Sequence, residues 1–208
     1  MGKKVKTKTF DRYVRDLEKG VFPEFEKEDI YCPPNNQHMY FAPSWHFRSG
    51  LLTREIVDDL KVNRRTILSV GSGSAYLERF LVKVCGVRSE QIVLSDMDPV
   101  MPNDFEQHRF NMYGSWPNFG REFNYVVFPE SVLINCIFHD DINKQSGLYH
   151  LLEQALRMSK PNARISMNGH CQSEENIEAV KERLYSKHFN LKLKYDRNLI
   201  VVESGELR

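Results

Sequence analysis

The sequence predicts an α/β fold in which a mostly parallel sheet is covered on both faces by helices. Three observations favour it. From Thr66 onward, short apolar runs alternate with segments that have the apolar spacing of helices. A glycine-rich turn joins the first apolar run to the first of these helices. The last two apolar runs are separated only by Asp196-Arg197-Asn198, a connection short enough for a β-hairpin.

The expected strands are short apolar runs of the kind that parallel sheets bury on both faces. They are residues 66–70, 91–94, 108–112, 125–128 and 163–167, followed by 190–195 and 199–202 in the hairpin. The expected helices cover 75–84, 148–158 and a segment that Ser173 opens as a cap. Pro161 cannot continue the second helix. We expect the final hairpin to add an antiparallel strand to the edge of the sheet.

Residues 1–62 differ from the rest of the chain in their pattern of apolar residues. We interpret them as an N-terminal extension to a domain that spans 63–208. Turn-forming clusters and aromatic residues replace the regular alternation seen later in the chain. The aromatic side chains of the extension either pack against the domain or form a lid over a substrate; they include His38, Tyr40, Trp45 and His46.

The composition is that of an ordinary globular protein, with 41% apolar residues among 208 and a formal net charge of +1. No run approaches the ~18 apolar residues that cross a bilayer, so we expect no membrane association. The four cysteines are widely spaced, which favours reduced thiols in the cytoplasm over a zinc or disulfide framework. Only the lysine-rich N-terminus suggests a surface for nucleic acid.

The first expected strand leads directly into Gly71-Ser72-Gly73 and then into a helix. Glycine lets the backbone turn sharply and lets a ligand lie against the main chain. Free amides at the start of the helix favour an anionic group there. A nicotinamide or flavin fingerprint needs a third glycine where this chain has Tyr76, so that reading is disfavoured. An ordinary tight turn remains the alternative.

Asp96 directly follows the second apolar run. A carboxylate at the C-terminal tip of that strand is placed to accept hydrogen bonds from both hydroxyls of a ribose. The alternative is a turn after the strand, because Asp98-Pro99 comes next.

Taken together, these motifs give the chain from about Asn63 a resemblance to class I, Rossmann-like, S-adenosylmethionine-dependent methyltransferases. Residues 67–80 resemble the first motif of that family and 95–99 its acidic second motif. Residues 123–130 resemble its fourth strand, and 155–164 the segment that leads into its fifth. The resemblance implies a seven-stranded, mostly parallel sheet with a C-terminal antiparallel hairpin, and S-adenosylmethionine as the cofactor.

The resemblance also implies a cofactor site along the carboxyl ends of the strands. The implied contact residues are Ser69, Gly71, Ser72, Gly73, Asp96, Met97, Asn111, Met112 and Pro129. The glycine loop would line the methionine part of the cofactor, and Asp96 would hold the ribose. Met97 would pack against the adenine, with Asn111 or Met112 near its edge. Pro129 and Glu130 would border the methionine amine and the transferred methyl.

Four places depart from the family pattern. Ser69 stands where an acidic residue usually precedes the first glycine, and Ala75 replaces the third glycine. Asn124 replaces the aspartate that opens the fourth strand, and Asn162-Ala163 replaces the glycine pair before the fifth strand. Ser69 and Asn124 favour the alternative of a degenerate, non-catalytic binding protein.

Candidates for a catalytic base follow the fourth and fifth strands: Glu130, His139, and Asn168 or His170. We expect a methyltransferase for a small molecule, with no metal. The motifs of amino-group and cytosine-carbon nucleic-acid methylases are absent from the sequence, although a nucleic-acid substrate stays open. A further alternative is transfer of an aminopropyl or aminocarboxypropyl group from the same cofactor. The sequence indicates no oligomeric state.

Overall fold

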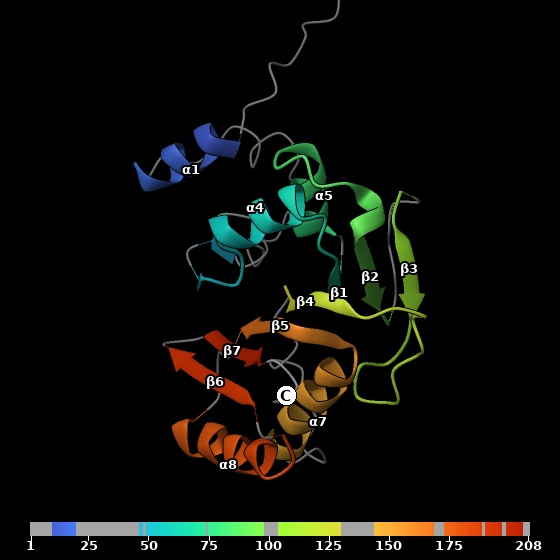
Figure 1. Ribbon diagram of the computed structural model, residues 1–208, viewed down its shortest axis with the longest axis vertical. Coiled ribbons are helices and arrows are strands. Elements are labelled where there is room, and N and C mark those ends of the chain that lie inside the picture. The colour runs from blue at the N-terminus through green and yellow to red at the C-terminus, as the bar shows by residue number, and fades with distance from the viewer. Residues whose placement is uncertain are drawn as a thin grey trace, which may run out of the picture.

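The computed structural model describes residues 10–19, 46–47, 49–73, 75–97, 104–129, 144–168, 173–188, 190–196 and 199–205. These residues form one seven-stranded sheet with helices on both faces (Figure 1). The strands are β1 (Ile67–Val70), β2 (Ile92–Asp96), β3 (Glu106–Arg109), β4 (Phe123–Phe128), β5 (Ser159–Asn168), β6 (Leu191–Asp196) and β7 (Leu199–Ser204). Their order in the sheet is β3-β2-β1-β4-β5-β7-β6. The predicted fold class, with its terminal antiparallel pair, is confirmed.

The terminal hairpin adds an antiparallel strand beside β5, at the edge of the parallel strands, as predicted. Strand β7 is antiparallel to both β5 and β6 and lies between them, so β6 forms the outer edge of the sheet. The side chains of the two strands explain this order. Ile200, Val201 and Val202 of β7 are buried, whereas Lys192 and Lys194 of β6 are exposed. Lysines suit an edge strand because they discourage pairing with another chain.

The third strand lies earlier in the chain than its predicted position at 108–112. Strand β3 ends before Phe110, and its side chains are exposed or only half-buried. Phe110 and Met112 instead belong to the following loop, where they pack against the main core. The Phe110 ring lies 5.5 Å from the ring of Trp116, centroid to centroid. The apolar run that predicted a strand therefore reflects packing by a loop.

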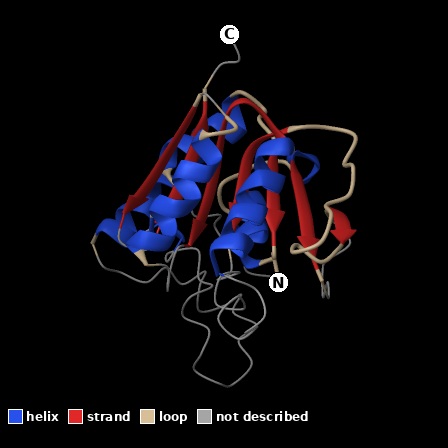
Figure 2. Cartoon of the chain, turned by 90° about the horizontal axis from the view of Figure 1, so that it is seen from below, coloured by secondary structure: helices blue, strands red, loops and turns tan. Residues whose placement is uncertain are grey.

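The helices form two layers around the sheet. They are α1 (Phe10–Glu18), α4 (Arg54–Val62), α5 (Tyr76–Lys83), α7 (Lys144–Arg157) and α8 (Glu174–Tyr185), with a short 3-10 turn η2 (Ser89–Gln91). Figure 1 shows α1, α4 and α5 on one side of the sheet and α7 and α8 on the other. Seen from below in Figure 2, the strands stand side by side with helices packed along them. Among the described helices, none is both long and apolar enough to cross a membrane.

Helix ends follow the chemistry that the sequence predicts. The Ser173 hydroxyl accepts a hydrogen bond from the Asn176 amide at 3.2 Å, which confirms the predicted cap of α8. Helix α7 ends before Pro161, as expected, but the proline itself lies within β5. The register with β4 shifts there, and Asn162 has a φ of +62°, so this end of β5 accommodates the proline as a bulge.

Helix α4 shares a core with α5, although the two lie on opposite sides of the predicted boundary between 62 and 63. Ile56, Val57 and Leu60 of α4 are buried in the same cluster as Leu77 and Phe80 of α5. The assignment of 1–62 as a separate extension stays a prediction. Of the aromatic residues proposed for a lid, His38, Tyr40 and Trp45 lie outside the described residues, and His46 is buried.

The side chain of Gln91 connects three elements at the amino end of the sheet. Its amide nitrogen donates to the carbonyl oxygens of Leu60 and Arg65, each at 2.7 Å. Its amide oxygen accepts from the Arg88 backbone at 3.3 Å. Gln91 therefore satisfies the C-terminal end of α4 and the approach to β1 at a buried position.

We predict that Gln91→Leu lowers the free energy of unfolding by about 2 kcal/mol, because two carbonyl groups lose their donor where water has little access. Urea denaturation monitored by circular dichroism measures the change. Glu90→Gln, on the same turn but exposed, is the control and should change stability by less than about 0.5 kcal/mol. Equal stability of both variants would contradict this role of Gln91.

Candidate functional site

The loop between β1 and α5 has the backbone geometry that its glycines suggested. Gly71 and Gly73 have φ values of +69° and +51°, which glycine adopts without strain. Ala75, at the position of the family's third glycine, also has a positive φ of +56° and is fully buried. A left-handed alanine costs roughly 1 kcal/mol, so this turn forms at some expense of stability.

This loop is hydrogen-bonded to the end of the neighbouring strand β2. The amides of Gly71 and Ser72 both donate to the carbonyl oxygen of Ser95, at 2.8 and 3.1 Å. The amide of Gly73 donates to Oδ2 of Asp96 at 2.9 Å. The two motifs that the sequence singled out therefore meet at one place, beyond the carboxyl ends of β1 and β2.

The end of β2 presents a carboxylate and an apolar side chain next to each other. Asp96 is partly buried, whereas Met97 is 56% exposed. The Met97 carbonyl accepts a hydrogen bond from Nε of Arg109 at 2.9 Å, which ties the tip of β2 to β3. The arrangement offers an acceptor for hydroxyl groups beside a surface on which a flat ring can lie.

Ser69 contacts helix α5 through its side chain. It is fully buried, and its hydroxyl donates to Oε1 of Glu78. Glu78 is 1% exposed, and among the described residues its Oε2 has no hydrogen-bond partner. Burial raises the pKa of Glu78 to about 7, while the bond from Ser69 and the charge of Arg79 act in the opposite direction. A carboxyl group therefore lies beside the position where the resembled family has an acidic residue.

Glu78 is a buried carboxyl group beside the candidate site that the sequence did not single out. The signal was present in the helical spacing, because Leu81 and Cys85 lie three and seven positions later on the same face and are buried. A glutamate on the apolar face of a helix is rare unless something pairs with it.

Asn124 has a structural role at the start of β4. Its side-chain oxygen accepts from the Thr66 amide at 3.1 Å and lies 3.3 Å from the Thr66 hydroxyl. An aspartate would offer the same acceptor, so the replacement of the family's aspartate preserves this bond. Asn124 lies at the amino end of the sheet, away from the glycine loop.

Other predicted contact residues are spread along the carboxyl edge of the sheet. Pro129 is buried directly after β4. Asn111 is exposed, and its side-chain oxygen accepts from the Tyr113 amide at 3.0 Å. The Met112 carbonyl accepts from the Trp116 indole at 2.8 Å. Their contacts with a cofactor stay predictions.

The predicted catalytic residues Glu130, His139 and His170 lie outside the described residues. Their roles therefore stay predictions. Asn168, the alternative to His170, ends β5 and is half-buried. Within the described ranges, no group of three His, Cys, Asp or Glu side chains is placed to hold a metal ion.

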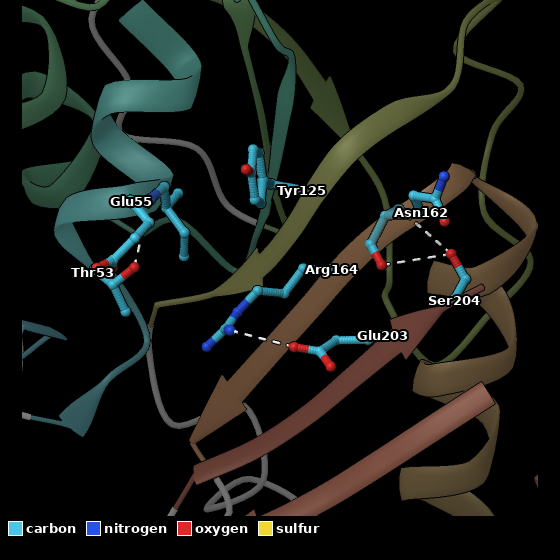
Figure 3. A pocket seen from close by; sticks show the side chains of 9 residues that line it. Thr53, Glu55, Tyr125, Asn162, Arg164, Glu203 and Ser204 are labelled. Atoms are coloured by element: carbon cyan, nitrogen blue, oxygen red, sulfur yellow. Dashed lines mark hydrogen bonds and ion pairs between the residues drawn. The ribbon is translucent and has the colours of Figure 1, made fainter. Parts of the chain in front are cut away.

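A hollow of about 530 Å³ lies elsewhere on the sheet, between α4 and the strands β4, β5 and β7 (Figure 3). Its lining residues are Thr53, Glu55, Ile56, Tyr125, Asn162, Ala163, Arg164, Glu203 and Ser204. Tyr125 pairs in register with Ile67, the first residue of β1, so the hollow is at the amino end of the strands. Ligands of doubly wound sheets bind beyond the opposite, carboxyl ends.

Several polar groups of this hollow are already engaged within the protein. Arg164 approaches Glu203 at 3.6 Å (Figure 3), and the Tyr125 hydroxyl donates to Asp59 at 2.6 Å. None of the residues predicted for the cofactor lines it. We therefore place the candidate site at the glycine loop, where two independent motifs converge.

No protein-family model matches this sequence, and a search of curated proteins finds no match. Several solved structures are similar in fold. The sugar N-methyltransferase KedS8 from Streptoalloteichus sp. ATCC 53650 aligns over 99% of this chain and 96% of its own, with a TM-score of 0.54 and 12% identity. A TehB-like SAM-dependent methyltransferase from Corynebacterium glutamicum aligns over 94% and 95%, with a TM-score of 0.51 and 16% identity.

The methyltransferase MycE of the mycinamycin biosynthetic pathway has a TM-score of 0.55 at 12% identity. The alignment covers 80% of this chain but only 52% of MycE, so the chain spans about half of that protein. At such identities the likeness concerns the fold alone. The chain has the Rossmann-like fold of class I methyltransferases, which confirms the fold that the resemblance implied.

We predict that Gly73→Ala lowers the melting temperature and abolishes binding of S-adenosylhomocysteine, because a side chain strains the positive φ of +51° and adds a methyl group where the ligand would approach the main chain. Gly120→Ala is a matched control, since Gly120 also has a positive φ, of +67°, and its substituent would meet nothing within 4 Å. The control should lose stability but not affinity. Unchanged affinity in Gly73→Ala would make the loop an ordinary connection.

We also predict that stability becomes less sensitive to pH in Glu78→Gln. The pKa of Glu78 is raised from 4.5 to about 7, so the folded state keeps a proton that the unfolded state releases. Burial of Glu78 therefore destabilises the parent increasingly as pH rises through this window, by roughly 3 kcal/mol in total. Urea unfolding between pH 5 and 8 measures the difference. Glu122→Gln, which is exposed, should follow the parent.

Proposed function

We propose that the chain is an S-adenosylmethionine-dependent methyltransferase that acts on a small molecule. The observation that carries the proposal is the hydrogen bond from the Gly73 amide to Asp96, at 2.9 Å. It joins a glycine loop and an acidic strand tip into one site at the carboxyl edge of the sheet. A simple strand-to-helix turn needs no such carboxylate.

The residues at this site fit the parts of S-adenosylmethionine. The Asp96 carboxylate has two oxygens that accept hydrogen bonds, as a ribose with two neighbouring hydroxyls requires. Met97 offers an apolar surface beside it for the adenine ring. Gly71 and Gly73 leave the main chain open to close approach by the methionine part of the cofactor.

When bound, the cofactor supplies a methyl group on a positively charged sulfur. The protein's task is to hold the acceptor atom in line with that methyl and to exclude water. A base within hydrogen-bond reach takes the proton of a hydroxyl or ammonium acceptor. We assign this task to Glu130, His139 or His170, on the grounds of their predicted places after β4 and β5.

The substrate class rests on charge and on two of the similar structures. The formal net charge of +1 gives little general attraction to nucleic acid. KedS8 is described as a sugar N-methyltransferase, and the MycE structure contains mycinamycin VI. These observations support a small-molecule substrate over a nucleic acid. We also propose that the enzyme is cytoplasmic.

Two alternatives keep the cofactor site but change the outcome. Transfer of an aminopropyl or aminocarboxypropyl group would use the same loop and the same acidic tip. A non-catalytic binding protein is favoured by the replacements at Ser69 and Asn124. However, Asn124 keeps the acceptor that an aspartate would provide, and Ser69 holds a carboxyl group in place. Both observations support a working site.

We predict that S-adenosylhomocysteine binds the parent protein. Asp96→Asn should lower this affinity by about tenfold or more, because a charge-assisted bond to the ribose is lost. Isothermal calorimetry measures the affinity. Asp104→Asn, an exposed carboxylate near the start of β3, is the charge-matched control and should bind like the parent. Binding of NADH without any binding of S-adenosylhomocysteine would overturn the proposal.

Product analysis separates the reactions. We expect the protein, supplied with S-adenosylmethionine and a small-molecule extract, to release S-adenosylhomocysteine and to label the small-molecule fraction from a methyl-labelled cofactor. Release of methylthioadenosine would instead indicate transfer of the aminopropyl or aminocarboxypropyl group. Label found only in added RNA would contradict the small-molecule assignment.

A further inference from the structure

A carboxyl group is buried at the base of the glycine loop without a full set of hydrogen bonds. Glu78 lies in the first turn of α5 and is 1% exposed. Its Oε1 accepts from Ser69, and its Oε2 has no hydrogen-bond partner within the described part of the chain. A buried polar atom without a partner is costly, so this one calls for an explanation.

The position of this carboxyl group is set by the strand as well as by the helix. Ser69 lies two residues before Gly71, and its carbonyl accepts a hydrogen bond from the Ser95 hydroxyl at 3.2 Å. The same Ser95 holds the glycine loop through its own carbonyl. Ser69 therefore links Glu78 to the end of β1 that leads into the glycine loop.

The neighbouring cation does not neutralise the group by contact. Arg79 lowers the pKa of Glu78 through its charge, but among the described residues the two form no ion pair. The Arg79 guanidinium instead lies over the Tyr76 ring, 5.1 Å from its centroid. The carboxyl group thus keeps one buried oxygen for a donor that the described part of the protein does not supply.

We propose that Glu78 recognises the ammonium group of the methionine part of the cofactor, a positioning role that rests on the proposed function. An ammonium group fits the unpartnered oxygen because it donates hydrogen bonds and because its positive charge favours the ionised form of the carboxyl group. The helix thereby supplies a carboxylate beside the point where β1 has Ser69 in place of an acidic residue. The serine hydroxyl orients that carboxylate.

Three ligands test this role because they share the adenosine part but differ at the amine. They are S-adenosylhomocysteine, its deamino analogue, and methylthioadenosine, which lacks the amino-acid part. We expect Glu78→Gln to lower the affinity for S-adenosylhomocysteine by about tenfold or more. Its affinity for the other two ligands should stay within about twofold of that of the parent. Calorimetry measures all three affinities.

Control variants make the result specific. Asp96→Asn should lower the affinity for all three ligands to a similar extent, because each carries a ribose. Glu122→Gln removes an exposed carboxylate and should leave all three affinities unchanged. Glu78→Gln keeps an oxygen that accepts from Ser69, so its circular dichroism should match the parent. The unmutated protein gives a test that needs no variant, because it should bind S-adenosylhomocysteine about tenfold tighter than the deamino analogue.

The outcomes distinguish this role from the proposed function. If the parent binds S-adenosylhomocysteine and its deamino analogue equally well, or if Glu78→Gln binds both like the parent, the role of Glu78 is overturned while the cofactor assignment stands. If the parent binds none of the three ligands, the proposed function itself fails. Weakening of methylthioadenosine by Glu78→Gln, equal to that of S-adenosylhomocysteine, would mean a general effect on the fold and would also overturn the role.

Discussion

The backbone carbonyl of Ser95 accepts hydrogen bonds from two successive amides of the glycine loop, and the next residue, Asp96, receives a third through its side chain. Because β1 and β2 are adjacent and parallel, their ends meet at one edge, and these bonds decide where the chain turns into α5. Both the place of Glu78 and the setting of Asp96 depend on that turn. A loop held in this way loses little further conformational freedom when a ligand binds.

The parts of the site that were predictable are those whose residue types have strict local requirements. Gly71 and Gly73 need positive φ values, and a carboxylate after a buried strand must lie at its carboxyl end, so the loop and Asp96 followed from the sequence. Glu78 did not, because a glutamate in a helix is usually solvated, and only tertiary packing shows that this one is buried against Ser69. Similarly, Phe110 suggested a strand although its ring packs from a loop.

The positions that depart from the family pattern differ from it in residue type more than in the chemical groups that are present. Asn124 accepts the hydrogen bond of the Thr66 amide, a task for which the negative charge of aspartate is unnecessary. Ser69 has no carboxyl group, but Glu78 of α5 places one beside it. Alanine at 75 accepts a left-handed backbone, and its methyl group is fully buried. A motif written as residue letters misses such exchanges.

The insertion of β7 between β5 and β6 has a consequence for the order in which the chain is made. A ribosome that has synthesised the chain only through α8 leaves one side of β5 unpaired, with the apolar Ile165 and Met167 beside an open row of backbone groups. Strand β6 cannot close this edge by itself, since β7 is its only neighbour in the sheet. The unpaired side of β5 is therefore covered only after β7 has been synthesised through Ser204. Until then β5 presents an unpaired edge, which is the kind of surface at which incompletely folded chains associate.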